Sequence, residues 1–562
     1  MQRVHIRDGH WRLVGWALAA AQLVAIGLWL NLSYAVNDDA AILQLFMGYF
    51  SDDLSLFHVY LHPLLCAVLK GCKAILPSAP WFSILQITLL TIASASVAGS
   101  LATVIWRRFE NLWAATIIPA AFLWIYLLLP CTSVTYTQTT AVLGMAAVLR
   151  LYTAGKETGS LYRAIAAAGV LWILAYALRA QAALPALAFC GLFFVLRWIH
   201  QRENRPALLR AGCVLAAVMA GLCLWQQLLP KTEAEQEYLN WHDARVAAID
   251  YNDLSDISEN VLKEMGWTET TARLLERWCF LDEDVNAESL TKLTSLLQQE
   301  NPTTPGERLR EAWRVLTWLW ARDESIRWPS LLTAVLLLIE GFFCLMDARS
   351  KHRALLPFGT LLLGAGMLFV LAWRGRLPTR AAQTVLLICG GLAMAQLALL
   401  SKKQLGPALL VIAVACVLQG MWQVPALGKN PDQELEMENA RAALEESALC
   451  EEEMLFIYDD SLMTDLRMFP DVSEGIPQNT TPWGGWLLRS AQSVAQMERF
   501  GLDPRHFDPA AFLREDVCLV TGIVDPGPEE FAGWLREKLD MNIDYFLYSE
   551  YEGIYCWQFY ES

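Results

Sequence analysis

Charged residues are scarce in this chain of 562 residues: Asp, Glu, Lys and Arg together make up 18% of it, whereas 55% is hydrophobic. The chain also contains 23 Trp, and its mean hydropathy is positive. This low fraction of charged residues and high fraction of hydrophobic residues exclude a disordered chain, a fibrous protein and a series of soluble domains. The composition is typical of a protein that is solvated in part by lipid.

An excess of basic residues is also lacking, because the net charge is -15. A surface of this sign argues against binding to nucleic acid, whose phosphates need Lys and Arg to release their counterions. The 13 cysteines do not have the spacing of a metal site. No glycine-rich phosphate-binding loop is found either, which weighs against a reaction driven by ATP or a nucleotide sugar.

Long apolar runs recur along the chain. A helix needs about 20 apolar residues to cross about 30 Å of hydrocarbon. Eleven segments meet this length, at 12–34, 82–105, 112–130, 133–150, 163–178, 184–198, 208–228, 329–347, 354–372, 381–400 and 405–424. The first is followed by no small-residue cleavage site, so we expect it to be retained. The predicted fold class is a polytopic all-α membrane protein with about 11 transmembrane helices.

Short loops rich in Lys and Arg stay cytoplasmic, and this rule orients the helices. With the N-terminus inside, the cytoplasmic segments hold 17 basic and five acidic residues. The two long polar regions then lie outside: 230–327 has 11 basic and 20 acidic residues, and 427–562 has 9 and 28. Counting the interrupted apolar stretch 57–77 as a span would invert every later loop. We therefore predict a re-entrant or surface-lying helix there, in a multi-pass plasma-membrane protein with an extracytoplasmic C-terminal domain.

This topology divides the chain into four parts. Residues 1–229 form a seven-helix membrane module that includes a first external loop at 35–81. Residues 230–327 form an external insert, in which GWTETTARLLERW and AESLTKLTSLLQQ have apolar residues at helical spacing. Four further membrane helices occupy 328–426. Strand-like and helix-like segments alternate in 427–562, which predicts a small external α/β domain.

The first external loop opens with Asn37-Asp38-Asp39 and continues as a predicted amphipathic helix on the bilayer surface. Two adjacent carboxylates at that depth are candidates for chemistry, and Asp38 and Asp39 could also hold a divalent metal. The alternative is that Asn37 or Asp38 caps the helix. His58 and His62 lie on one helical face without a third metal ligand, so we consider them as substrate contacts.

Four arginines and one acid stand out further along the chain. Arg179 lies where the chain turns at the outer surface; it either reaches lipid phosphate or binds the phosphate of a lipid-linked substrate. Arg374, Arg376 and Arg380 make the loop between spans nine and ten the one strongly basic external loop, which indicates an anionic partner, either a specific phosphate or outer-leaflet lipid. Glu340 lies alone within span eight, and an intramembrane acid is a functional candidate.

A first helix, an external loop that begins with an Asp-Asp pair, a surface helix and the segment His62-Pro63-Leu64 together resemble the GT-C class of integral-membrane glycosyltransferases. In that class a seven-helix module is followed by further helices and often by a soluble external domain. The NDDA opening and the segment YLNWHDARVAAIDYND are similar to those of a bacterial subgroup. The missing Trp-Trp-Asp signature of oligosaccharyltransferases argues against transfer to Asn side chains.

The resemblance implies a sugar donor on a polyprenyl phosphate or pyrophosphate, and an acceptor hydroxyl at the extracytoplasmic face. Asp38 or Asp39 would be the general base, and the donor phosphate would be bound by Arg179, Arg374, Arg376 and Arg380. The acceptor, in the modification of an envelope glycan, would be a glycan, a lipid or a protein. No cofactor is indicated apart from a divalent metal on the Asp pair. Two alternatives use the same features differently: a transporter or flippase for a lipid-linked substrate, and a noncatalytic protein of envelope assembly.

Overall fold

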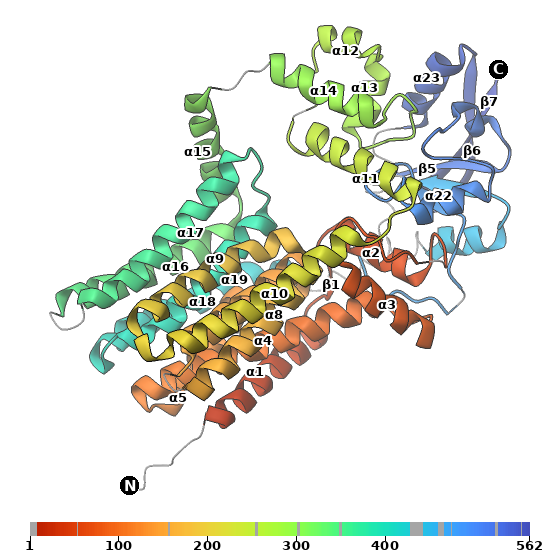
Figure 1. The fold of residues 1–562 in the computed structure, drawn as a ribbon. Coiled ribbons are helices and arrows are strands. Elements are labelled where there is room, and N and C mark those ends of the chain that lie inside the picture. Colours follow the sequence, from red (N-terminus) through yellow and green to blue (C-terminus); the bar gives the residue numbers. More distant parts are fainter. Residues whose placement is uncertain are drawn as a thin grey trace.

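The structure is a computed structural model that describes residues 8–52, 54–155, 158–252, 254, 257–300, 304–347, 351–427, 442–458, 466–473, 475–522, 527–551 and 553–562. A bundle of long helices is followed at one end by a layer of short helices and a sheet (Figure 1). The N-terminus lies at the far end of the bundle and the C-terminus in the sheet layer.

Each apolar segment predicted to span the membrane forms a helix. These helices are α1 (Asp8–Trp29), α4 (Trp81–Phe109), α5 (Leu112–Tyr126), α7 (Tyr136–Thr153), α8 (Thr158–Leu178), α9 (Ala180–His200), α10 (Arg205–Leu228), α16 (Glu324–Met346), α17 (Leu355–Trp373), α18 (Thr379–Gln396) and α19 (Lys402–Leu427). Among the described residues, nine helices are long and apolar enough to cross a membrane, and α5 and α7 are the two that fall short. The polytopic helical fold class is therefore confirmed.

Small residues allow some of these helices to approach closely. Gly15 of α1 faces α4, where an added Cβ would lie 2.4 Å from the carbonyl oxygen of Ala95 and 2.6 Å from the amide nitrogen of Gly99. Helices α7 and α18 contact each other in the middle of the bundle and are buried along almost their whole length. Neither therefore has a polar face, as expected for a helix surrounded by protein.

A two-stranded parallel sheet connects the first external loop with the middle of the membrane module. Strand β1 (Ser33–Tyr34) pairs with β2 (Ser133–Val134), which follows the short helix α6 (Leu128–Thr132). Helix α2 (Asn37–Met47) begins just after β1, and α7 begins just after β2. The pairing therefore places the first turns of α2 and α7 side by side.

The first external loop differs in two respects from the prediction. Val36 precedes the first turn of α2 and makes no side-chain cap, so the capping role considered for Asn37 and Asp38 is wrong. The apolar residues of α2, such as Ile42 and Phe46, are buried within the protein core rather than laid on the bilayer. The second helix of the loop, α3 (Pro63–Ile75), has 13 residues. At 1.5 Å per residue this is about 20 Å, too short to span the membrane.

The insert consists of α11 (Glu233–Arg245), a π-helical turn (Val246–Asp250), α12 (Glu259–Met265), α13 (Glu269–Glu276), α14 (Ala287–Glu300) and α15 (Pro305–Arg322). Side-chain caps begin several of these helices. Thr232 and Glu235 form a capping box at α11, and Thr304 and Glu307 form another at α15. Helix α15 packs against α17, beside the bundle, whereas the other helices of the insert lie toward the sheet layer (Figure 1).

The C-terminal domain is a five-stranded mixed sheet with flanking helices, as predicted. Its strands are β3 (Leu455–Tyr458), β4 (Thr480–Pro482), β5 (Val517–Gly522), β6 (Ile543–Tyr551) and β7 (Ile554–Glu561), in the order β4-β3-β5-β7-β6. Strands β4, β3 and β5 are parallel, and β7 and β6 continue antiparallel. Helices α22 (Ala491–Glu498) and α23 (Pro528–Leu539) complete the domain.

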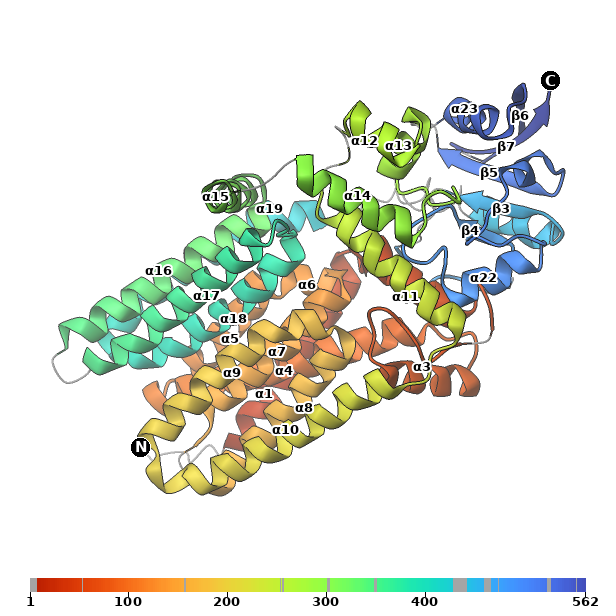
Figure 2. The ribbon, with the colours of Figure 1, turned by 45° about the horizontal axis from the view of Figure 1, so that its top comes forward.

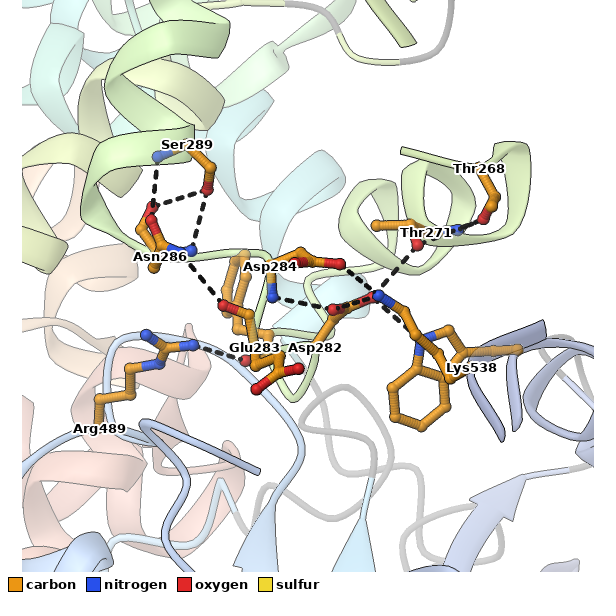
Figure 3. Close-up of polar contacts among 11 residues, drawn as sticks. Thr268, Thr271, Asp282, Glu283, Asp284, Asn286, Ser289, Arg489 and Lys538 are labelled. Carbon is orange, nitrogen blue, oxygen red and sulfur yellow. Dashed lines mark hydrogen bonds and ion pairs between the residues drawn. The ribbon is translucent and has the colours of Figure 1, made fainter. Parts of the chain in front are cut away.

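The insert and the C-terminal domain are joined by a buried polar cluster (Figure 3). The carboxylate of Asp282 accepts hydrogen bonds from Thr271 Oγ1 at 3.2 Å, Trp534 Nε1 at 3.1 Å and Lys538 Nζ at 2.8 Å. Lys538 also pairs with Asp284 at 2.6 Å. The two parts also share one hydrophobic core. Together they form a single cap over one end of the membrane bundle.

Candidate active site

A cavity of about 1260 Å³ lies where the membrane helices, the first external loop, the insert and the C-terminal domain meet. In Figure 2, α11 runs across the junction between the bundle and the sheet layer, where the cavity is found. Five arginines and three aspartates line it: Arg179, Arg245, Arg277, Arg376, Arg380, Asp38, Asp243 and Asp250. The cavity is therefore cationic although the chain as a whole is acidic, which suits an anionic ligand.

Asp38 and Arg380 meet across this cavity. Asp38 lies in the first turn of α2, and Arg380 in the first turn of α18. A guanidinium nitrogen of Arg380 lies 3.3 Å from a carboxylate oxygen of Asp38, and both side chains remain about one fifth exposed. The acid of the first loop and a guanidinium from far along the chain thus form a solvent-accessible pair.

Asp39 points away from the cavity, because adjacent residues of a helix face about 100° apart. It is fully buried, and its Oδ1 accepts hydrogen bonds from Gln86 Nε2 at 2.8 Å and from the backbone N–H of Tyr136 at 2.7 Å. Its Oδ2 has no hydrogen-bond partner among the described residues. Burial raises the pKa of Asp39 to about 8. Asp39 is therefore mainly a neutral carboxyl group at pH 7 that ties α2 to α4 and α7.

Arg179 precedes α9 and lines the cavity rather than extending into lipid. One of its guanidinium nitrogens donates a hydrogen bond to Thr137 Oγ1 at 2.8 Å. The guanidinium lies 4.5 Å from the ring centre of Tyr136 and 5.5 Å from that of Tyr60. No acidic side chain of the described residues pairs with it. Its charge is held in place by neutral groups and is available to an anion.

The three arginines of the basic segment at the start of α18 do not all lie in the cavity. Arg376 and Arg380 line the cavity, where Arg376 forms an ion pair with Asp250 of the insert. Arg374 is exposed and does not line the cavity. The structure therefore supports a shared site for two of the three predicted arginines and not for Arg374.

The other predicted contacts lie outside the cavity wall. His58 is buried; its Nδ1 accepts the N–H groups of Tyr60 and Leu61, and burial lowers its pKa to about 3. His62 caps α3 by accepting the N–H of Leu64 at 3.1 Å. Both histidines shape the loop and do not reach the cavity.

Glu340 is also absent from the wall of the cavity. It is fully buried within α16, and neither carboxyl oxygen has a hydrogen-bond partner among the described residues. The structure thus gives no support for direct contact between substrate and His58, His62 or Glu340.

The two acids of the first loop do not form a joint metal site. Asp38 faces the cavity, whereas Asp39 accepts two hydrogen bonds in the core. Within the described part of the chain, no group of three or more His, Cys, Asp or Glu side chains is arranged to hold a metal ion. The donor set therefore does not fit the divalent cation considered from the sequence.

Several polar residues of the wall were not predicted. At the membrane end, Gln138 of α7 donates to Gln383 of α18, and Gln383 donates to Ser325 of α16 at 2.9 Å. At the end away from the membrane helices, the insert supplies His242 and Arg245, and the C-terminal domain supplies further residues. A signal was present, because glutamines are polar residues inside otherwise apolar spans.

No protein-family model matches the chain, and no curated protein matches it. It is similar to crystal structures of ArnT from Cupriavidus metallidurans, one in the apo state and one bound to undecaprenyl phosphate. Both are 12% identical to it and are matched over 98% of each chain, with TM-scores of 0.35 and 0.37. At these TM-scores the similarity carries no argument about function, which rests on the geometry of the site.

Proposed function

We propose that this protein transfers a sugar from a polyprenyl-phosphate or polyprenyl-pyrophosphate donor to an acceptor hydroxyl at the extracytoplasmic face of the membrane. The observation that carries the proposal is the pairing of Asp38 with Arg380 in a cationic cavity, beside an Arg179 that has no acidic partner among the described residues. Sugar transfer from an anionic lipid needs a carboxylate as base and a guanidinium to bind the phosphate, and it needs both beside the membrane helices. This cavity combines the three features.

The donor phosphate is bound between Arg179 and Arg380 in this proposal. Both guanidinium groups line the cavity on the side of the membrane helices, and each can donate two parallel hydrogen bonds to phosphate oxygens. Gln138 and Gln383 lie in the same part of the wall and offer further polar contacts. These donors stabilise the negative charge that collects on the phosphate as it leaves the sugar.

Asp38 acts as the general base. Its carboxylate accepts the proton of the acceptor hydroxyl, whose oxygen forms a bond to the anomeric carbon of the sugar. The bond from that carbon to the phosphate oxygen breaks at the same time, and the phosphate keeps the electron pair. A single displacement of this kind inverts the configuration at the anomeric carbon. Because Arg380 pairs with Asp38 in the structure, an arriving phosphate competes for this guanidinium and frees the base.

The test uses the full-length protein in lipid nanodiscs with a panel of polyprenyl-phosphate sugars labelled in the sugar. Wild-type protein is expected to release polyprenyl phosphate and to move the label to an acceptor in a membrane extract. Arg179→Gln should lower kcat/KM for the donor by about 100-fold, because a charged hydrogen-bond donor to phosphate is lost. Arg374→Gln is the matched control, since Arg374 is exposed outside the cavity, and it should stay within twofold.

The same preparation separates the alternative functions. A flippase would move fluorescent polyprenyl phosphate across proteoliposomes without cleaving the bond between sugar and phosphate. An assembly protein would do neither. If wild-type protein moves the lipid but cleaves no donor of the panel, the transferase proposal is wrong.

A further inference from the structure

A second cationic group occupies the external end of the cavity. Arg245 ends α11 and lines the cavity, although the residue is only 2% exposed. Its Nε and Nη1 have no hydrogen-bond partner among the described residues. The carboxylate of Asp250 approaches Nη1 only to 3.9 Å, beyond hydrogen-bonding distance. The other oxygen of Asp250 pairs with Arg376. Arg245 is thus a buried cation whose only ion-pair partner among the described residues, Asp250, makes no hydrogen bond to it, an arrangement that costs free energy and that a hydrogen-bonded anion would relieve.

Trp278 forms a platform beside this guanidinium. The guanidinium carbon of Arg245 lies 5.3 Å from the ring centre of Trp278, and Trp278 is 39% exposed and lines the cavity. Trp278 adopts a φ of 63°, in the left-handed region that bulky residues rarely occupy. A backbone bridge from Cys279 to Gly484 and a 3.0 Å bond from Phe280 N to Trp483 O hold the chain there. Strained backbone of this kind is concentrated at binding sites.

His242 adds a neutral polar group on the same side of α11. It lies three residues before Arg245, which places the two side chains on one helical face. It is 6% exposed and lines the cavity, and its Nδ1 has no hydrogen-bond partner among the described residues. Burial, together with the nearby charge of Arg245, lowers its pKa to about 3, so the ring is neutral at pH 7. A neutral imidazole exchanges hydrogen bonds with a hydroxyl group.

We infer that Arg245, Trp278 and His242 form the acceptor subsite, and that the acceptor is a glycan that carries an anionic group. Arg245 binds the anion, the indole of Trp278 packs against a sugar ring, and His242 bonds to a sugar hydroxyl. The inference rests on the proposed function, which requires an acceptor on the external side. A phosphate and a carboxylate share the chemistry that Arg245 recognises.

The position of this subsite relative to the base supports the assignment. Asp38, Tyr60 and Arg245 all line the same cavity, and the charges of Asp38 and Arg245 both act on the hydroxyl of Tyr60, so both lie near it. Arg376, which pairs with Asp250 next to Arg245, precedes Arg380 by four residues in the chain, and Arg380 pairs with Asp38. An acceptor held by its anionic group at Arg245 can thus extend a hydroxyl toward Asp38.

The experiment measures binding in the absence of any donor, so its outcome does not depend on sugar transfer. Full-length protein in nanodiscs is titrated by ligand-observed NMR with glucose 6-phosphate, glucuronate and methyl glucoside. At least one anionic sugar is expected to bind about tenfold or more tightly than the neutral one, and the stronger of the two identifies the anion. Equal binding of all three sugars would overturn the inference, whether or not the protein transfers sugars.

Two variants distinguish recognition from a structural role. Arg245→Gln should remove most of the preference for the anionic sugar, a loss of about tenfold or more, and Arg245→Lys should keep part of it. Arg489→Gln is the matched control: Arg489 is 6% exposed and lies 5.0 Å from the ring centre of Trp241, but it does not line the cavity. The control should lose stability and keep the preference.

Folding of each variant is checked by its apparent melting temperature. If Arg245→Gln does not fold, Arg245→Lys and Trp278→Leu decide the question. An unchanged preference in Arg245→Lys together with unchanged affinity for all three sugars in Trp278→Leu, with melting temperatures close to that of wild type, would refute the subsite. Failure of donor cleavage in the separate transfer assay would instead count against the proposed function alone.

Discussion

Exchanging each acid of the first loop for its amide separates the two roles proposed for the pair. Asp38→Asn removes the carboxylate that faces the cavity. Asp39→Asn changes a buried group whose hydrogen bonds both go to Oδ1, from Gln86 and from the N–H of Tyr136. The amide oxygen of Asn can accept both bonds, and its NH2 replaces an Oδ2 that has no partner among the described residues. The first change should therefore abolish chemistry, and the second should preserve it.

The expected magnitudes differ by orders of magnitude. A general base contributes about 10²- to 10⁴-fold to the rate, so Asp38→Asn should raise the barrier by about 3 to 5 kcal/mol. Asp39→Asn should leave kcat within about threefold. Asp39→Ala should lower stability by about 2 to 5 kcal/mol, because the side chain of Gln86 and the N–H of Tyr136 lose their buried acceptor.

Stability of the same variants against pH tests the buried carboxyl group. The pKa of Asp39 is about 8 in the folded protein and 3.8 in the reference state. Since the unfolded chain releases this proton first, wild-type stability should fall as pH rises from about 4 to about 8. The loss attributable to this group is on the order of 5 kcal/mol. Asp39→Asn should remove that part of the pH dependence.

The measurements are sugar transfer from a labelled polyprenyl-phosphate donor and apparent melting temperature at pH 5 and pH 8, in one detergent. Donor binding by Asp38→Asn serves as the control for folding. Loss of transfer in Asp39→Asn with normal turnover in Asp38→Asn would show that the base has been assigned to the wrong residue. An unchanged pH dependence in Asp39→Asn would contradict the buried neutral carboxyl group.

Three further outcomes are expected. Arg179→Lys keeps a charge but loses the planar fork, so the KM for the donor should rise by about tenfold in a donor titration; an unchanged KM would remove the phosphate from this position. Gly15→Val should sharply reduce the yield of folded protein on size-exclusion chromatography, because α4 backbone lies 2.4 Å from the added Cβ, whereas Gly27→Val should have no effect, since nothing lies within 4 Å of its Cβ. Lys538→Met should lower the stability of the external cap by about 3 kcal/mol in a proteolysis assay, because it leaves the buried carboxylate of Asp282 without its cation; equal proteolysis rates would contradict this role.

The membrane helices could be predicted because their signal is local. A run of about 20 apolar residues is readable without knowing any neighbour, and the charge of short loops then orders the spans. The acid and guanidinium groups of the site could be predicted for a related reason: Asp38 and Arg380 are charged residues in sequence directly next to predicted membrane spans. Their direct contact, however, depends on β1 and β2 pairing and on α7 and α18 packing, which no local pattern specifies.

The predicted contacts that lie outside the cavity wall share a physical feature. Buried polar residues are used both for scaffolding and for chemistry, and only the partners of each atom distinguish the two. His62 caps the start of α3 by accepting the N–H of Leu64, and His58 accepts two backbone N–H groups. Arg245 ends α11 and Trp278 follows α13 by two residues; the helical periodicity of these two stretches reveals a buried face but not which donors lack an acceptor.

The joint between the insert and the C-terminal domain has a consequence for the exchange of modules between related chains. Trp241 and Phe280 of the insert share a core with Leu455 and Trp483, so neither segment has a complete hydrophobic interior alone. A chimera that replaced only the residues after 441 would place foreign side chains against Asp282 and Trp278. The insert and the C-terminal domain therefore have to be exchanged together, although four membrane helices separate them in the sequence.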